Sequence, residues 1–405
     1  VPSIAEEKID NAKYLENFKA NSKDVAKVFG EIVVQANMGR MKPMNSLNMQ
    51  IVQKLTKKSS FLGMNPDQIV LGMLTAPDIW SDVKMISIKT PKLKKILGVP
   101  ESRKYIAFSE VFTKDGYVLT EYSKNANAID AKLRGTFERD VIKIDERLSI
   151  AFQVFNGDLF KLFPKPKHAS SEDLNNKWFT PMEAMQEFPE EDAKIVQTMT
   201  RGFITHILNE NYTDAIKYAG LIKQFQQKIG SDVMPSQSVL DMELLFNELD
   251  IFPKITLAYV LLGLVLFIVA FFTVFNEKLA SRKLNLTIFS ILAILFAIQT
   301  AGMAMRWYIS GHAPWSDTYE SLIYIGWSAM FAGLFFFRKS TLALSATVVM
   351  AGIFMFTAHL SHIDPQITNL VPVLKSYWLT IHVSIITGSY GFLAIGCMLG
   401  FMALL

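Results

Sequence analysis

Ile255–Phe275, ITLAYVLLGLVLFIVAFFTVF, is a run of 21 residues without a charged side chain. A helix of this length measures about 30 Å at 1.5 Å per residue, which is enough to cross the hydrocarbon core of a bilayer. Four further apolar stretches follow, at about Leu286–Met305, Ser321–Phe337, Ser340–His359 and Tyr377–Leu405. The sequence therefore predicts a bundle of about five transmembrane helices over residues 255–405, in which the short third stretch sits between other helices.

The distribution of charge divides the chain at the start of this bundle. Residues 255–405 hold 7 of the 41 Lys and Arg residues and 4 of the 37 Asp and Glu residues, which leaves 34 and 33 for residues 1–254. The first part has the composition of a soluble domain, so a wholly embedded transporter is excluded. An aromatic share of 12% excludes a disordered chain. The net charge of +4 creates no strong basic field, so no nucleic-acid partner is expected.

Residues 1–254 are predicted to form a mostly helical domain with minor β-structure. Thr213–Gly230 carries apolar residues at three- and four-residue spacing between a capping residue and a glycine, and Ser236–Leu249 repeats the pattern. The stretch VKMISIK, residues 83–89, and the residues around Asp115-Gly116 are predicted as strands or a hairpin. The predicted fold class is thus mainly α, with a helical domain at 1–254 followed by a membrane bundle at 255–405.

The short connections between the apolar stretches indicate how the chain crosses the membrane. The first and third connections hold five Lys and Arg residues, whereas the second and fourth hold only Arg306 and Lys375. Positive residues gather on the cytoplasmic side. We therefore expect a multi-pass protein whose N-terminal domain and whose second and fourth connections are extracytoplasmic.

The two ends of the sequence and its cysteine content limit these expectations. The chain begins at Val1 without an initiator methionine and closes on an apolar run through Leu405, so we expect it to be a piece of a longer polypeptide. Its single cysteine, Cys397, lies within that run. One cysteine provides neither a disulfide framework nor a Cys-x-x-Cys-His haem-attachment motif.

Four of the six histidines lie in the membrane half, on its predicted outer side. They are His312, His359, His362 and His382. Ionisable residues in or near a membrane are candidates for function. Three have a structural alternative, because His359 and His362 flank a helix end and His312 lies in a turn before the next helix. His382, about one turn inside the last stretch and just after Trp378, needs a metal, a carboxylate or a backbone carbonyl as its partner.

The type of metal can be narrowed from the spacing of these residues. A zinc site needs three or four His, Cys or carboxylate ligands in close order, which this pattern does not offer. Haem needs one or two axial nitrogens and a wide apolar and aromatic wall. Aromatic residues on the same side could form that wall: Trp307, Trp315, Trp327, Trp378, Tyr308, Tyr319 and Tyr324. The same residues could instead form an interfacial belt, so composition leaves both interpretations open.

Two strings in the membrane half are distinctive: RWYISGHAPWSDTYESLIYIGW (306–327) and HLSHIDPQITNLVPVLKSYWLTIHVSIITGSYGFL (359–393). They resemble the CcsA/ResC family of cytochrome c biogenesis proteins, whose fused CcsBA form is the System II holocytochrome c synthetase. The N-terminal domain resembles the family only loosely, in VQANMGRMKPMNSL (34–47) and KKSSFLGMNPDQIVLGML (57–74).

The resemblance implies a haem-binding protein of the bacterial cytoplasmic membrane. Such proteins receive haem from the cytoplasmic side, hold it at an external site and present its vinyl groups to the thiols of apocytochrome c Cys-x-x-Cys-His motifs. In the family the His of the WL-x-x-HV string is an axial ligand of the external haem, and here that residue is His382. Weaker candidates around the haem are Trp378, His312, Trp315, His359 and His362, and no catalytic acid or base is predicted.

The chain also departs from the family pattern. The tryptophan-rich WWD segment, a second external His and a later span with an internal His would all lie beyond Leu405. Whether these CcsA and CcsB segments belong to the same chain or to a partner chain is open. Holocytochrome c synthase activity is therefore uncertain, and the fragment alone is not expected to catalyse thioether formation.

Smaller features of the outer side have two interpretations each. Asp317 and Glu320 are predicted to cap the third apolar helix or to make polar contacts near the site. Arg306 is predicted either to pair with a haem propionate or to anchor its helix at the interface.

Two other classes of function compete with haem handling. A membrane-anchored extracytoplasmic scaffold or sensor would place the function in residues 1–254, but it leaves the outer histidines unexplained. A transporter has little support, because the apolar stretches hold almost no carboxylates and Gln299 is the main polar residue in the second one.

Overall fold

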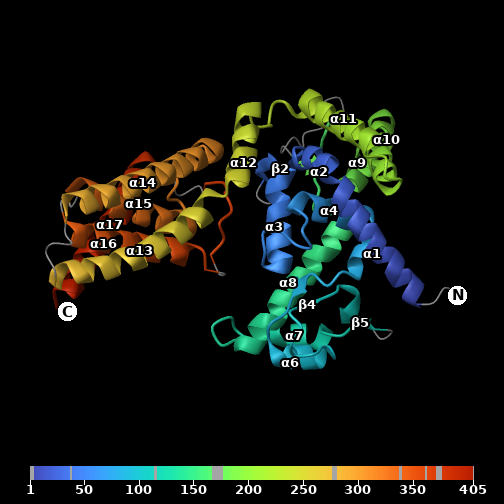
Figure 1. Ribbon diagram of the computed structural model, residues 1–405. Helices are drawn as coiled ribbons and strands as arrows, with labels where there is room; N and C mark the ends of the chain where they lie inside the picture. Colours follow the sequence, from blue (N-terminus) through green and yellow to red (C-terminus); the bar gives the residue numbers. More distant parts are fainter. Residues whose placement is uncertain are drawn as a thin grey trace. The chain divides into compact units, whose positions relative to one another are not determined.

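The computed structural model describes residues 4–36, 39–113, 116–166, 177–275, 281–336, 340–360, 363–370 and 376–404. The chain is mainly α-helical, as predicted, and it divides into two compact units, Val1–Ser236 and Gln237–Leu405 (Figure 1). The assignment of separate functions to residues 1–254 and 255–405 stays a prediction.

The first unit consists of eleven α-helices among the described residues and four short strand pairs. The helices are α1 (Ile4–Asn21), α2 (Lys23–Gly30), α3 (Met44–Thr56), α4 (Pro66–Thr75), α5 (Pro77–Ser81), α6 (Pro91–Ile96), α7 (Thr120–Ala128), α8 (Thr136–Asn156), α9 (Pro181–Glu187), α10 (Glu190–Leu208) and α11 (Tyr212–Gly230). The predicted helix at residues 213–230 is confirmed as α11, which begins one residue earlier because the Asn211 side chain accepts a hydrogen bond from the Asp214 backbone N–H.

The strands of this unit form four antiparallel pairs. They are β1 (Val33–Gln35) with β2 (Met41–Pro43), β3 (Ile86–Ser87) with β4 (Tyr105–Ile106), β5 (Phe112–Thr113) with β6 (Gly116–Tyr117), and β7 (Phe163–Pro164) with β8 (Trp178–Phe179). The strand predicted at residues 83–89 is present as β3. The hairpin predicted near Asp115-Gly116 is present as β5 and β6, although Asp115 itself lies outside the described residues.

A buried glutamine joins distant parts of the first unit. Gln226 of α11, only 1% exposed, donates hydrogen bonds to the carbonyls of Val33 (2.7 Å) and Leu162 (2.9 Å) and accepts one from Val33 N–H (3.1 Å). These bonds satisfy backbone groups that the short strands leave open inside the apolar core.

The second unit is a bundle of six helices among the described residues. They are α12 (Gln237–Leu249), α13 (Ile251–Phe275), α14 (Arg282–Ser310), α15 (Thr318–Phe336), α16 (Thr341–Ala358) and α17 (Tyr377–Leu404). The helix predicted at residues 236–249 is confirmed as α12, which packs on α14. In the core of the bundle α16 packs against α13 and α15, and α15 also packs against α17.

Four stretches of this described bundle are long and apolar enough to cross a membrane. They are Gln237–Thr273, Arg282–Ser310, Thr341–Ala358 and Tyr377–Leu404. The count differs from the prediction of about five, because α15 is helical but is not among the four. Its first turn is polar around Glu320, and α16 and α17 both pack against it, which agrees with the predicted position between other helices.

A buried polar network lies within the apolar bundle. Gln299 of α14 is fully buried; its side-chain oxygen accepts a hydrogen bond from Tyr259 of α13 (2.9 Å), and its nitrogen donates to the carbonyl of Ile323 in α15 (3.1 Å). Because a polar group in an apolar environment must find its partners within the protein, these bonds specify how the three helices align.

Candidate functional site

His382 lies in the second turn of α17, and its side chain is exposed. Among the residues that the structure describes, none forms a hydrogen bond with its imidazole. Trp378 precedes it by one helical turn on the same side of α17 and is 77% exposed; its ring packs edge-on to Tyr377, with centroids 5.7 Å apart. The start of α17 therefore presents an accessible imidazole beside accessible aromatic rings.

His359, by contrast, has partners on both ring nitrogens. It caps the C-terminal end of α16, where Nδ1 lies 2.7 Å from the carbonyl oxygen of Met355 and 3.2 Å from Oγ1 of Thr256. Donation from Nδ1 to the carbonyl leaves Nε2 as the acceptor, and Nε2 lies 3.4 Å from the hydroxyl of Tyr319. His359 thus connects α13, α15 and α16.

Of the other two predicted histidines, the structure describes His312 but not His362. His312 follows α14, and its Nε2 lies 3.0 Å from the carbonyl oxygen of Thr368 while its Nδ1 lies 3.2 Å from that of Ala313. His362 lies outside the described residues. Within the described ranges no group of three or more His, Cys, Asp and Glu side chains could hold a metal ion.

Arg306 and Glu320 form a buried ion pair at the same end of the bundle as His312. They are 2% and 1% exposed, and Nε of Arg306 lies 2.7 Å from Oε1 of Glu320. The second oxygen of Glu320 accepts hydrogen bonds from the backbone N–H (2.9 Å) and hydroxyl (2.7 Å) of Ser316. Arg306 is therefore neither an interfacial anchor with its head group in water nor open to a propionate, because its guanidinium is used inside the protein.

Asp317 has the capping role that the sequence predicted. Its Oδ1 accepts a hydrogen bond from the Glu320 backbone N–H at 2.8 Å, at the start of α15. Glu320 makes the polar contact that was the other prediction for this pair.

A row of aromatic rings follows α15 through the bundle. Successive centroid distances are 5.7 Å for Trp307 and Trp315, 4.7 Å for Trp315 and Tyr324, 5.7 Å for Tyr324 and Trp327, 5.7 Å for Trp327 and Phe331, and 4.4 Å for Phe331 and Phe335. Of the seven aromatic residues named from the sequence, Trp307, Trp315, Tyr324 and Trp327 lie in this row and Trp378 does not. That they form a wall around haem stays a prediction. Phe331 and Phe335 were missed, although successive spacings of three, four and four residues from Tyr324 through Trp327 and Phe331 to Phe335 are a signal that could have found them.

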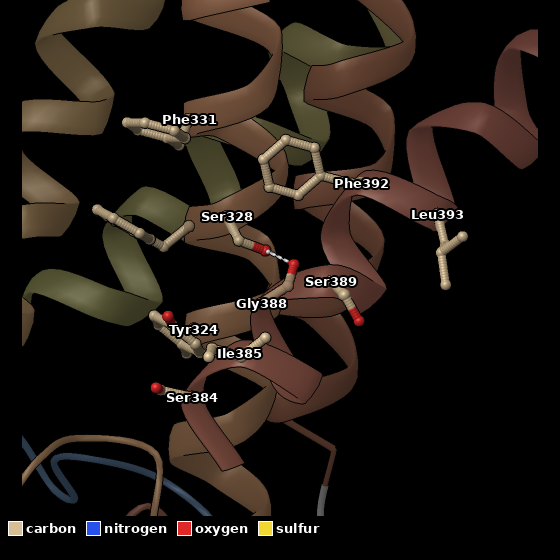
Figure 2. Close-up of a pocket in the computed structure, with 10 residues that line it drawn as sticks. Tyr324, Ser328, Phe331, Ser384, Ile385, Gly388, Ser389, Phe392 and Leu393 are labelled. Atoms are coloured by element: carbon tan, nitrogen blue, oxygen red, sulfur yellow. Dashed lines mark hydrogen bonds between the residues drawn. The ribbon is translucent and has the colours of Figure 1, made fainter. Parts of the chain in front are cut away.

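Part of this row lines a groove between α15 and α17, with a volume of about 510 Å³. From α15 come Tyr324, Trp327, Ser328 and Phe331, and from α17 come Ser384, Ile385, Gly388, Ser389, Phe392 and Leu393. Figure 2 shows these side chains and the hydrogen bond, 2.9 Å long, from the Ser328 hydroxyl to the Gly388 carbonyl, which joins the two helices.

His382 is not among the residues that line this groove; it precedes Ser384, the first lining residue of α17, by two positions. Its seven-residue spacing from Ser389 places it on the side of α17 that carries Ser389, whereas Gly391, nine residues on, faces α15. A groove of this size, apolar and aromatic with a few polar groups, is typical of sites for flat organic cofactors. An imidazole on one of its two helices, without a partner among the described residues, is the donor that haem iron accepts. The residues present therefore fit a haem.

Comparison with known proteins agrees with this geometry. Residues 315–405 match the family model "Cytochrome C assembly protein". Protein NrfI of Wolinella succinogenes is 47% identical over 393 residues, which is 96% of this chain and 43% of that protein. The cytochrome c biogenesis protein CcsA of Synechococcus sp. strain WH7803 is 36% identical over 120 residues, 29% of this chain and 38% of CcsA, and that of strain RCC307 is 40% identical over 104 residues, 25% and 33%.

The similarities to these relatives cover only part of each relative's length. The chain spans less than half of the length of each of these relatives. The similarity to NrfI includes the N-terminal unit, whereas the matches to CcsA cover about a third of the chain or less. The predicted resemblance to the CcsA/ResC family is confirmed by the family match, which includes the groove and His382.

Proposed function

Residues 315–405 match the cytochrome c assembly protein family, and on this basis we propose that the chain is part of a protein that binds haem and presents it to apocytochrome c. His382 is the proposed axial ligand. The observation that carries the proposal is its accessible imidazole, without a hydrogen-bond partner among the described residues, on α17 two positions before the first residue that lines the aromatic groove.

In this proposal each part of the site has a physical task. If haem binds here, a ring nitrogen of His382 would hold the iron, and the groove walls, including Tyr324 and Phe392, would lie against a flat apolar ring and keep water from it. When bound, haem supplies the vinyl groups to which the cysteine thiols of an apocytochrome c are joined. The exposed ring of Trp378 lies beside the same imidazole and is proposed to cover one edge of the bound ring.

The weaker candidates from the sequence are given other roles than binding the iron, except for His362. His359 and His312 already have carbonyl partners, so we assign them to holding the bundle and its outer loop rather than the iron. Trp315 contributes its ring to the aromatic row, and its indole N–H is buried without a partner among the described residues. It is the candidate donor to a bound polar group. His362 is retained as a weaker candidate from the sequence alone.

The orientation belongs to the same proposal. The distribution of Lys and Arg supports an extracytoplasmic position for the site and for the N-terminal unit, in a bacterial cytoplasmic membrane. Thiol labelling tests this: in a Cys397→Ser background, Ser310→Cys should react with an impermeant reagent added outside, and Ser281→Cys should not. The reverse pattern contradicts the proposed orientation.

The axial ligand is tested on the full-length parent protein, purified from membranes of cells with ample haem. We expect the wild type to carry haem with a low-spin spectrum typical of two imidazole ligands, and His382→Ala to lose most of that signal because one ligand is removed. His206→Ala is the matched control, since His206 lies in the first unit, where its ring stacks on Tyr218 at 5.3 Å. A colourless wild type, or a His382→Ala variant with an unchanged spectrum, would contradict the proposal.

A further inference from the structure

Arg147 of α8, in the first unit, is a buried charge that no carboxylate of the described residues pairs with. Its side chain is 7% exposed. Its Nε donates a hydrogen bond to the carbonyl of Lys54 at 3.1 Å, and its Nη1 donates one to the carbonyl of Ser87. These bonds join α8 to the end of α3 and to β3, against which α8 packs (Figure 1). They satisfy donors of the guanidinium but leave its positive charge uncompensated.

Four lysines gather around this guanidinium from three elements. Lys54 and Lys57 lie at the C-terminal end of α3, Lys89 follows β3 by two residues, and Lys143 precedes Arg147 by one turn of α8. Burial lowers the pKa of Lys57, and so does repulsion from the other four cations. The five side chains are therefore close enough to interact, and we call them the α3–α8 basic cluster.

The carboxylates that reach this cluster do not balance its charge. Glu146 lies 3.4 Å from the ammonium of Lys54, and Asp140 lies 3.9 Å from that of Lys143. The other two lysines form no ion pair with any residue that the structure describes. Five cations against two carboxylates leave three positive charges in excess. Like charges held this close cost free energy, which an anion from outside the described chain would recover.

A purely structural role explains only part of the cluster. Lysines at the end of a helix interact favourably with its last carbonyls, which accounts for Lys54 and Lys57. It does not account for Lys89, which follows a strand, or for Lys143, which lies within α8.

The chemistry of the cluster indicates what kind of ligand fits it. Ammonium and guanidinium groups are donors only, so the ligand has to supply acceptors. A phosphate group offers several acceptor oxygens and one to about two negative charges, which suits an excess of positive charge better than a neutral acceptor does.

We propose that the α3–α8 basic cluster is a binding site for a phosphate group. The ammonium groups donate hydrogen bonds to its oxygens, and the buried guanidinium of Arg147 supplies a positive charge that its two carbonyl partners hold in place. The phosphate belongs either to a soluble anion or to the head group of an anionic phospholipid, since both present the same oxygens. The site lies wholly in the first unit and does not depend on the role of His382.

The test uses the full-length parent protein in detergent. Lys57→Gln combined with Lys89→Gln removes two charges of the cluster and leaves the buried Arg147 in place. The matched control is Lys124→Gln combined with Lys228→Gln, at exposed positions of α7 and α11. The probes are sodium phosphate, compared with sodium chloride at equal ionic strength, and short-chain phosphatidylglycerol, compared with short-chain phosphatidylcholine. The rise of the melting temperature with probe concentration gives the affinity.

We expect at least one probe to raise the melting temperature of the wild type. The Lys57→Gln/Lys89→Gln variant should bind that probe roughly 10-fold more weakly or worse, because each charge-assisted hydrogen bond contributes about that factor. Without a probe the same variant should melt no lower than the wild type, since repulsion within the cluster is relieved. The control should bind and melt as the wild type does.

The results separate the two sources of phosphate and can overturn the site. A response to sodium phosphate alone assigns a soluble anion, and a response to phosphatidylglycerol assigns the lipid head group. No response to either probe overturns the proposal. So does an equal loss of affinity in the control, because the effect would then follow net charge alone. A cluster variant that binds as tightly as the wild type and melts lower without a probe also overturns it, because these lysines would then serve only the fold.

Discussion

Asp67 shows how burial changes the chemistry of one residue in the first unit. Its side chain is 6% exposed at the start of α4, and it accepts hydrogen bonds from the side chains of Asn45 (2.7 Å) and Asn48 (2.8 Å). Desolvation of the carboxylate outweighs these two bonds and raises the pKa of Asp67 from 3.8 to about 6. The folded state therefore binds this proton more tightly than the unfolded state does.

The sign of this shift gives a prediction for stability. Between about pH 4 and pH 6 the folded state holds more protons, so the free energy of unfolding falls as the pH rises, by about 3 kcal/mol for a shift of this size. Asp67→Asn should remove this dependence and stabilise the unit above pH 6. The side-chain oxygen of Asn48 has no partner among the described residues. If the side-chain amide of Asn48 turns by half a rotation, this oxygen can accept a hydrogen bond from the amide nitrogen introduced at position 67. Thermal unfolding from pH 4 to 8 measures this, and a parallel pH profile for both proteins contradicts it.

His382, Asp317 and Arg306 show which contacts of single residues can be predicted from the sequence and which cannot. His382 was proposed from the sequence because an imidazole in an apolar helix needs a partner, and its role as a ligand stays a prediction. The capping role of Asp317 could be predicted because a capping residue acts on its own helix. Arg306 was misjudged because its partners Pro365 and Gln366 are 59 and 60 positions away. No periodicity or local spacing relates an arginine to two such carbonyls, so the pairing becomes visible only in three dimensions.

At the scale of elements, the contact between α15 and α17 forms one wall of the site. Gly391 makes it possible: a Cβ atom there would lie 2.6 Å from the backbone nitrogen of Ala329 and 2.7 Å from the carbonyl oxygen of Ile325. Small residues allow helices in membranes to approach this closely. The groove beside the contact, on the same two helices, depends on that separation.

Gly391→Ala should therefore push α17 away from α15. Backbone atoms cannot yield as a flexible side chain does, so we expect a loss of about 1–3 kcal/mol in stability and weaker haem binding. Gly396→Ala on the same helix is the control, because no atom lies within 4 Å of its added Cβ. Thermal unfolding in detergent compares the two variants. Equal melting temperatures for both would show that the close contact does not matter.

The helices themselves were largely predictable, because apolar runs and capping residues are local signals. The four long apolar helices and the strand at β3 follow from such patterns. The position of α15 between other helices was predicted from its short length, but the partner that Glu320 in its polar first turn finds on α14 was not. The groove likewise requires knowing that α15 and α17 are neighbours, which the sequence does not state.

At the scale of the whole molecule, the two units divide the chain near the point where its charge density changes. The first unit has its own core, and its similarity to NrfI indicates that it accompanies the membrane bundle in that relative too. The bundle carries the family match, the groove and the candidate ligand. Within this chain the proposed haem site therefore uses residues of the second unit alone, and the first unit is proposed to be extracytoplasmic without a role in ligation.

The central claim is that His382 binds the haem iron, and replacing His382 by a different iron-binding side chain tests it. In the full-length parent, His382→Met keeps a side chain that can bind iron but replaces imidazole by a thioether, which raises the reduction potential of haem. We predict retained haem with a higher potential and a changed low-spin spectrum, measured by spectroelectrochemical titration. A His382→Met protein that holds haem with the potential and spectrum of the wild type would show that His382 is not a ligand, and it would contradict the account.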